Sequence, residues 1–259
     1  MVRLKKFFEK FFFKNHYYIC KKNLEELIEI EINDILINHY QNKKFKSEIK
    51  ILLQELIGTS IYEGLKIIES LIQTKNIEGD VCEFGVAQGK TSKLIAYVIK
   101  KLRTKKLFLY DSFQGLPKPS RKDELIDDIF NLGSIYEYEG KMNHSEYKVN
   151  QELSKIGFSK NRVVLNKGFF NQKTIKNFKF PKIVAFAYLD FDFYEPIADV
   201  LKTIEKKLIK NSIIIVDDYD FFSSGVKKAV DEWLKPRKKK FNFKIFKSSQ
   251  SSFIKITKK

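Results

Sequence analysis

Apolar and polar positions change their spacing near residue 79, and this change divides the chain into two parts. Before it, apolar residues recur at the three- and four-residue intervals of amphipathic helices. The helices predicted there are residues 1–19, 23–41 and 47–74. Gly58 interrupts the last of these, and Ser60, a good N-cap residue, starts a fresh helix.

After residue 79, short apolar runs alternate with stretches of helical spacing. The runs that predict strands are residues 80–84, 107–110, 162–165, 182–189 and 212–216. The stretches that predict helices are residues 94–102, 197–208 and 224–235. This alternation predicts right-handed crossovers and a parallel sheet with helices on both faces. Two alternating runs near the end, 241–246 and 253–256, predict an antiparallel hairpin.

The connection between the second and third predicted strands is much longer than a tight βα loop. It covers about residues 117–160 and begins with a polar stretch at residues 120–123. Loops of this length in a compact domain are usually lids or binding elements. We therefore expect a lid above the carboxyl end of the sheet.

Two neighbouring strands of the predicted sheet stop at pairs of acids. Asp190 and Asp192 follow the fourth strand, and Asp217 and Asp218 follow the fifth. Because the carboxyl ends of parallel strands open into one crevice, we expect the four carboxylates to meet there. Such acids repel each other unless a cation lies among them, and oxygen ligands favour Mg²⁺, Ca²⁺ or Mn²⁺. The alternative is that they are ordinary polar residues at strand ends.

The first strand ends in a glycine-containing loop, where a cofactor usually approaches the backbone. Only three residues separate Gly85 from Gly89, so the loop is not a P-loop, and it also lacks the GxGxxG dinucleotide pattern. In the remaining form, E-x-G-x-x-x-G, Glu83 and backbone amides hold a cofactor with an amino-acid head. Asp111, at the end of the second strand, suits ribose hydroxyls. Together with the antiparallel hairpin, these features indicate S-adenosylmethionine.

The composition limits the partners and the location of the protein. The net charge is +17, and a surplus of ten positive charges lies after residue 224, where there are twelve Lys or Arg residues and two acids. Such a surplus attracts nucleic acid, anionic lipid or phosphorylated molecules, but no nucleic-acid motif accompanies it, so we expect no nucleic-acid partner. Two cysteines fit neither a disulfide framework nor a zinc site. Without a signal peptide or membrane span, we expect a cytoplasmic protein.

Residues 1–19 combine a phenylalanine stripe with lysines, as basic amphipathic helices do. Such a helix can lie in a membrane interface, or dock on its own domain or on a second subunit. We favour docking over peripheral membrane contact, which leaves room for a homo-oligomer.

Several short motifs, in the right order, resemble the macrocin O-methyltransferase (TylF) family. The most specific are residues 111–117 (DSFQGLP) and 215–219 (IVDDY). The others are residues 62–63, 79–80, 83–86, 190–195 and 225–231. The resemblance covers about residues 58–235, or two thirds of the chain. Phe191 stands where the family usually has glycine between two acids.

This resemblance implies a Rossmann-like class I methyltransferase with a mostly parallel seven-stranded α/β sheet and N-terminal helices. The family needs Mg²⁺ and methylates a hydroxyl group, often on a sugar. Its metal ligands carry over to Asp190, Asp217 and Asp218, and its general base carries over to Asp192. Its cofactor-binding positions carry over to Glu83, Gly85, Gly89, Asp111, Ser112 and Gly168. We expect a helical extension over residues 1–45 and a methyltransferase domain over residues 46–259.

The acceptor is expected to be a small molecule, either a sugar or a nucleotide- or phosphate-linked sugar, which the basic surface would favour. Asp192 would take the proton of its hydroxyl group, or alternatively support the metal site from outside. Two other functions stay open. One is methylation of a phenolic or catechol acceptor, and the other is a non-catalytic module that binds a membrane or a partner. The retention of all four acids argues against the second.

Overall fold

The computed structural model describes residues 43–102, 104–247 and 251–259 of the chain. The chain divides into two units, residues 1–54 and residues 55–259, which are described separately. In the first unit the described element is helix α2 (Lys43–Gln54). The helices predicted over residues 1–19 and 23–41 lie outside the described residues. Within the described ranges, no helix is both long enough and apolar enough to cross a bilayer.

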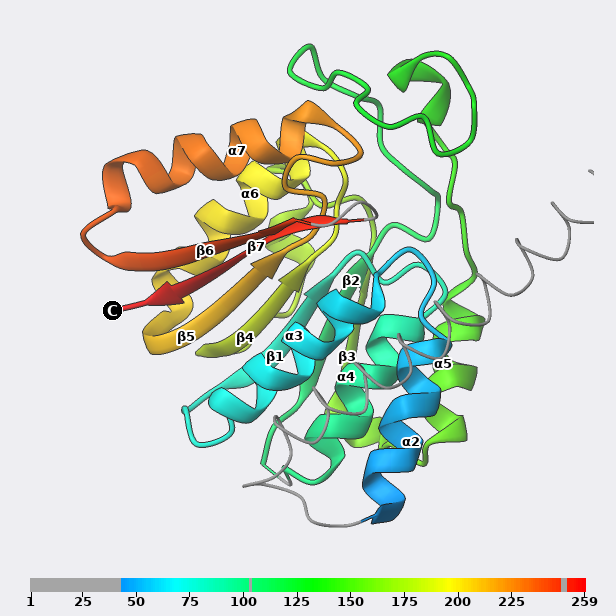
Figure 1. The fold of residues 1–259 in the computed structure, drawn as a ribbon, viewed down its shortest axis with the longest axis vertical. Helices are drawn as coiled ribbons and strands as arrows, with labels where there is room; N and C mark the ends of the chain where they lie inside the picture. The colour runs from blue at the N-terminus through cyan, green and yellow to red at the C-terminus, as the bar shows by residue number, and fades with distance from the viewer. Residues whose placement is uncertain (1–42, 103, 248–250) are drawn as a thin grey trace, which may run out of the picture. The chain divides into compact units, whose positions relative to one another are not determined.

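The second unit is built around a seven-stranded sheet with the order β3-β2-β1-β4-β5-β7-β6 (Figure 1). The strands are β1 (Asp80–Phe84), β2 (Leu107–Asp111), β3 (Val163–Lys167), β4 (Val184–Leu189), β5 (Leu208–Val216), β6 (Phe241–Lys247) and β7 (Ser252–Lys258). The first five pair in parallel, and β7 pairs antiparallel with β5 and β6. The predicted sheet, with its antiparallel hairpin, is confirmed.

Helices cover both faces of this sheet, so that all six residues of the central strand β4 are buried. The helices are α3 (Ile61–Gln73), α4 (Lys90–Lys100), α5 (Glu146–Lys155), α6 (Tyr194–Ile204) and α7 (Ser224–Leu234). Short 3-10 turns are η1 (Ile135–Tyr138), η2 (Lys160–Arg162), η3 (Ile175–Asn177), η4 (Glu205–Lys207) and η5 (Lys235–Arg237). α6 packs against α7 on one face, and α4 packs against α3 and α5 on the other (Figure 1). Ser60 caps α3, as predicted, by accepting a hydrogen bond from the backbone N–H of Glu63.

Two elements differ from the sequence prediction. Leu208, which we counted in the apolar stripe of the preceding helix, begins β5, because α6 ends at Ile204 and one 3-10 turn follows. The long connection predicted as a lid contains helix α5. Its buried apolar residues are only Val149 and Leu153, so its apolar stripe is too narrow to stand out in the sequence.

Candidate functional site

The predicted acids follow the carboxyl ends of the neighbouring strands β4 and β5, and β4 also pairs with β1. The backbone N–H of Asp190 donates to the carbonyl of Phe84 at 2.7 Å, and that of Asp217 donates to the carbonyl of Leu189 at 2.9 Å. The parallel ladder therefore continues one residue past the strands. As a result, the turn that starts at Asp190 and the turn that starts at Asp217 begin next to each other at the same edge of the sheet.

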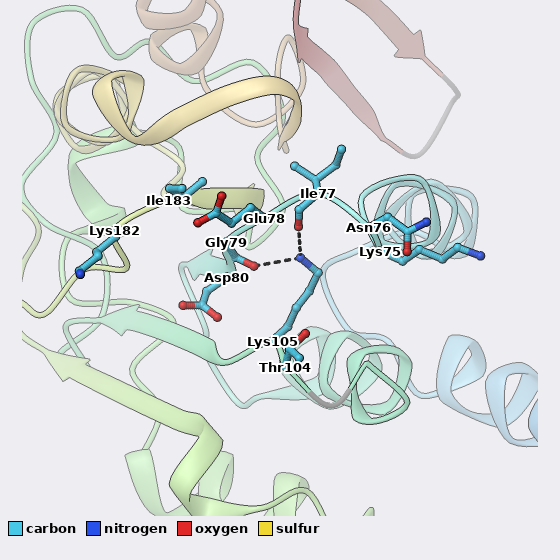
Figure 2. Close-up of a pocket in the computed structure, with 10 residues that line it drawn as sticks. All are labelled: Lys75, Asn76, Ile77, Glu78, Gly79, Asp80, Thr104, Lys105, Lys182 and Ile183. Carbon is cyan, nitrogen blue, oxygen red and sulfur yellow. Dashed lines mark hydrogen bonds between the residues drawn. The ribbon is translucent and has the colours of Figure 1, made fainter.

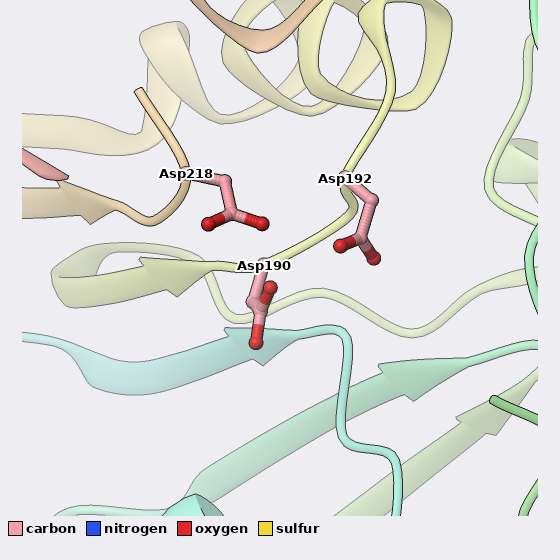
Figure 3. A group of neighbouring side chains, drawn as sticks. All are labelled: Asp190, Asp192 and Asp218. Carbon is pink, nitrogen blue, oxygen red and sulfur yellow. The ribbon is translucent and has the colours of Figure 1, made fainter. Parts of the chain in front are cut away.

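Three carboxylates converge beyond these strand ends. Asp190, Asp192 and Asp218 each offer an oxygen, and the three oxygens lie within 4.8 Å of one another (Figure 3). Asp192 and Asp218 have φ angles of +59° and +52°, in the left-handed region that side chains other than glycine rarely adopt. None of the ion pairs found among the described residues involves any of the three. This acidic trio therefore lacks a counter-charge from the described residues.

Burial raises the pKa of all three aspartates well above the usual value. The charge of Asp217 is the next cause for Asp190 and Asp218, and the charge of Asp190 is the next cause for Asp192. Carboxylates held this close either take up protons or need a cation among them. Carboxylate oxygens are the hard donors that Mg²⁺, Mn²⁺ and Ca²⁺ prefer. The donor set therefore fits a divalent ion.

Asp217 lies beside the acidic trio but belongs to a different network. Its Oδ2 accepts a hydrogen bond from the Tyr188 hydroxyl at 2.8 Å, and its Oδ1 accepts one from the backbone N–H of Asp218, also at 2.8 Å. The fully buried carboxyl of Glu63 faces it, and burial, followed by the charge of Asp217, raises the pKa of Glu63 well above its usual value. The structure thus brings together Asp190, Asp192 and Asp218 and turns Asp217 inward.

Glu63 was not predicted as part of the site, although the sequence holds a signal for it. It lies four residues before Ile67 on the apolar face of α3, where an acid is out of place. A buried acid on an apolar helix face needs a polar partner. In this fold Glu63 faces Asp217, and neither of its carboxyl oxygens has a hydrogen-bond partner among the described residues.

The glycine loop passes directly beside the acidic trio. Gly85 has a φ angle of +87°, and a Cβ atom at this position would overlap the carbonyl oxygen of Asp190. Only glycine allows the loop after β1 to approach the turn after β4 so closely. Gly89, with φ +80°, occupies the N-cap position of α4. Both predicted glycines are therefore required by the backbone conformation.

Asp111 ties the end of β2 to this loop. Its Oδ2 accepts hydrogen bonds from the backbone N–H groups of Val86 and Ala87, at 2.7 and 2.9 Å. The backbone N–H of Gly168 donates to the Asp111 carbonyl at 2.9 Å. Ser112 closes the following turn through a hydrogen bond from its Oγ to the carbonyl of Gly115 at 2.9 Å. Asp111 thus joins the glycine loop to Gly168, whereas Ser112 bonds within its own turn.

Glu83 is buried beneath the loop. Its Oε2 accepts a hydrogen bond from Ser92 Oγ at 2.5 Å, and its Oε1 has no hydrogen-bond partner in the described part of the chain. Burial raises the pKa of Glu83 to about 8, although the hydrogen bond from Ser92 opposes the shift. An unpaired buried acceptor is costly unless a ligand supplies a donor. Glu83 therefore fits a cofactor that carries an N–H donor.

We expect Glu83→Gln to flatten the pH dependence of stability of the ligand-free protein. Glu83 is protonated in the folded state up to a pH of about 8 and ionised above pH 4.5 when unfolded. Its contribution is therefore fully present below pH 4.5 and lost as the pH rises through 8. Between those values it lowers the unfolding free energy by about 1.4 kcal/mol per pH unit. Denaturant unfolding at pH 5.5, 6.5 and 7.5 measures this slope, and an equal slope in the variant would contradict the expectation.

A cavity of ≈ 590 Å³ lies at the opposite, amino end of the strands (Figure 2). Lys105 is 3% exposed there, and its Nζ donates to the carbonyls of Ile77 and Gly79 at 2.6 and 2.9 Å. These bonds hold the loop that leads into β1. None of the predicted site residues lines this cavity. The cavity is therefore separate from the predicted site at the carboxyl end of the sheet.

The sequence of this chain is similar to a known methyltransferase family and to a curated methyltransferase. A family model described as macrocin-O-methyltransferase (TylF) matches residues 38–246. Mycinamicin III 3''-O-methyltransferase from Micromonospora griseorubida is 29% identical over 167 residues. That match covers 63% of this chain and 64% of the relative, so the chain spans less than two thirds of the length of this curated protein.

Two solved structures share the fold. The O-methyltransferase NovP gives a TM-score of 0.63 at 19% identity, over 91% of this chain and 100% of that chain. CalS11, described as a calicheamicin methyltransferase, gives a TM-score of 0.58 at 19% identity, over 88% of this chain and 91% of that chain. At these identities the likeness establishes the fold alone. The predicted Rossmann-like methyltransferase fold is confirmed.

Proposed function

Because the chain belongs to the macrocin-O-methyltransferase (TylF) family, we propose that it transfers a methyl group from S-adenosylmethionine to a hydroxyl group of a sugar or sugar-like molecule. The observation that carries this proposal is the close approach of the glycine loop to the acidic trio, which would put the cofactor beside a group that can accept a proton. The apo structure of CalS11, which is similar to this chain in fold at 17% identity, is described as a TDP-rhamnose 3'-O-methyltransferase, and this supports a nucleotide-linked sugar as the acceptor. The net charge of +17 fits such an anionic acceptor.

The cofactor would be held by the residues around the glycine loop. The free Oε1 of Glu83 can accept a hydrogen bond from the amino-acid head of the cofactor. Asp111 accepts three backbone hydrogen bonds, so a carboxylate with about four acceptor sites has room for roughly one ribose hydroxyl. The bound cofactor supplies an electrophilic methyl group. The protein therefore needs no nucleophile and acts by alignment and proton transfer.

Asp190 and Asp218 would hold a divalent ion such as Mg²⁺. A bound ion would lower the pKa of a hydroxyl group beside it. Asp192, within 4.8 Å of both through its carboxylate, would accept the proton of the acceptor hydroxyl, a contribution worth about 10²–10⁴-fold in rate. Asp217, the third ligand implied by the family, would first have to leave Tyr188. We propose that it instead supports the site from the buried side.

A direct assay tests this function. The purified chain is incubated with S-adenosylmethionine and nucleotide sugars in Mg²⁺, in EDTA, and in EDTA followed by excess Mg²⁺. We expect methylated sugar, loss of product in EDTA and recovery with Mg²⁺, since the acidic trio repels itself without a cation. Undiminished turnover in EDTA would remove the metal from the proposal.

The alternative functions are outcomes of the same assay. Product from catechol but from no sugar would establish a phenolic acceptor. Failure to bind S-adenosylhomocysteine in calorimetry would leave a non-catalytic binding module. Cytoplasmic location, and docking of residues 1–19 on their own domain or on a second subunit, stay predictions.

A further inference from the structure

The first part of the long connection, residues 120–127, is attached to the starts of α6 and α7 by contacts that the proposed function does not use. We refer to it as the 120–127 strap. The backbone N–H of Ile126 donates to the carbonyl of Phe222 at 2.9 Å. The backbone N–H of Ser224 donates to the carbonyl of Glu124, also at 2.9 Å. The strap is therefore joined to the segment that follows β5 and leads into α7.

Asp123 lies at the centre of these contacts and is only 3% exposed. Its Oδ2 accepts hydrogen bonds from the backbone N–H and the Oγ of Ser120, both at 2.7 Å. Its Oδ1 accepts one from the backbone N–H of Tyr194, the first residue of α6, at 2.8 Å. The N-cap residue of that helix is Phe193, whose side chain makes no capping bond. Asp123 thus caps α6 from a distant part of the chain, with its charge at the positive end of the helix dipole.

Gly225, in the first turn of α7, makes room for this carboxylate. A Cβ atom at Gly225 would overlap Oδ1 of Asp123 and lie 2.8 Å from the backbone nitrogen of Tyr194. Its φ angle is outside the left-handed region, so the backbone conformation does not demand glycine. Glycine is also a poor helix former compared with alanine. The position is explained by the space that Asp123 occupies.

We propose that Asp123 is a positioning residue for the acidic trio. By fastening the start of α6 over Gly225, it holds the turn of residues 190–193 in the conformation that presents Asp190 and Asp192. The hydroxyl of Ser223 supports the same turn by donating to the Asp192 carbonyl at 2.6 Å. The left-handed backbone of Asp192 is strained, and such a conformation persists only where the surroundings impose it. The use of the turn rests on the proposed function, whereas the Asp123–Gly225 contact does not.

A double-mutant cycle tests the contact. The variants are Asp123→Ala, Gly225→Ala and both together, with Asp123→Asn as the conservative replacement that keeps one oxygen acceptor. Hydrogen exchange of the Tyr194 amide reports the cap, Mn²⁺ affinity reports the acidic trio, and S-adenosylhomocysteine affinity is the control. We expect Asp123→Ala to speed exchange and weaken Mn²⁺ binding, each by about tenfold, the effect of losing a hydrogen bond to a charged group. Asp123→Asn should recover part of both, with cofactor affinity unchanged throughout.

Gly225→Ala should reproduce these effects by displacing Asp123, and should add nothing in the Asp123→Ala background, where the space is vacant. Equal harm from Gly225→Ala in both backgrounds, or unchanged exchange in Asp123→Ala, would overturn the contact. Faster exchange with unaltered Mn²⁺ affinity would reduce Asp123 to a structural role and overturn the positioning proposal. A wild-type protein that binds no Mn²⁺ but shows the coupled exchange pattern would overturn the metal part of the proposed function and leave the contact standing.

Discussion

Asp218→Asn should reduce methyl-transfer turnover by about 10²–10³-fold, the effect of losing one electrostatic stabiliser at a reacting centre. Asp218 shares the acidic trio with Asp190 and Asp192. An asparagine keeps the shape of the side chain but removes a negative charge, so a divalent ion loses one of its charged donors. The measurements are turnover with the acceptor found in the sugar screen and Mn²⁺ affinity by calorimetry.

Asp217→Asn is the matched control, one residue away in the sequence. The Asp217 carboxylate is engaged by Tyr188 and faces Glu63, so the neutral amide should leave Mn²⁺ affinity within a few-fold of wild type. S-adenosylhomocysteine affinity should be unchanged in both variants. If Asp217→Asn abolishes Mn²⁺ binding as completely as Asp218→Asn, Asp217 turns toward the ion on loading and is the third ligand that the family implies.

The side chains of Asp217 and Asp218 point in different directions. A sequence motif therefore predicts which acids lie near the site, but not which way their side chains point. Successive residues of an extended chain point to opposite sides, whereas residues two apart share a side. Asp190 and Asp192 are two apart and converge, but Asp192 is left-handed rather than extended, so this alternation alone does not bring them together. Asp217 and Asp218 are adjacent, and the left-handed backbone of Asp218 aims its carboxylate at the other pair while Asp217 stays inside.

The sheet could be predicted because apolar runs and their spacing are local features of the sequence. The partners of Asp123 are not local: Tyr194 and Gly225 lie 71 and 102 residues further along the chain. Its own surroundings, the polar residues 120–123, read as an ordinary loop. Only the fold, which places the starts of α6 and α7 together, gives this aspartate a buried position and three hydrogen bonds.

Gly85→Ala is expected to weaken S-adenosylhomocysteine binding by more than about 100-fold and to destabilise the fold by about 1–3 kcal/mol. Two costs combine at this position. The φ angle of +87° is unfavourable for alanine, and the new Cβ would overlap the Asp190 carbonyl. Relief of the overlap requires the glycine loop and the acidic turn to separate, which opens the cradle where the cofactor meets the acceptor. Calorimetric titration and thermal unfolding measure the two effects.

Gly133→Ala separates these costs, because Gly133 also has a left-handed backbone, with φ +77°, but a Cβ there would meet nothing within 4 Å. In Gly133→Ala the alanine has a similarly unfavourable φ angle, but its Cβ overlaps no other atom. We therefore expect this variant to lose roughly 1 kcal/mol of stability and to keep its cofactor affinity. The difference between the two variants therefore measures the close approach of the loop to Asp190. Equal cofactor affinity in Gly85→Ala and Gly133→Ala would mean that the loop binds its ligand without that approach, and the cradle would have to lie elsewhere on the sheet edge.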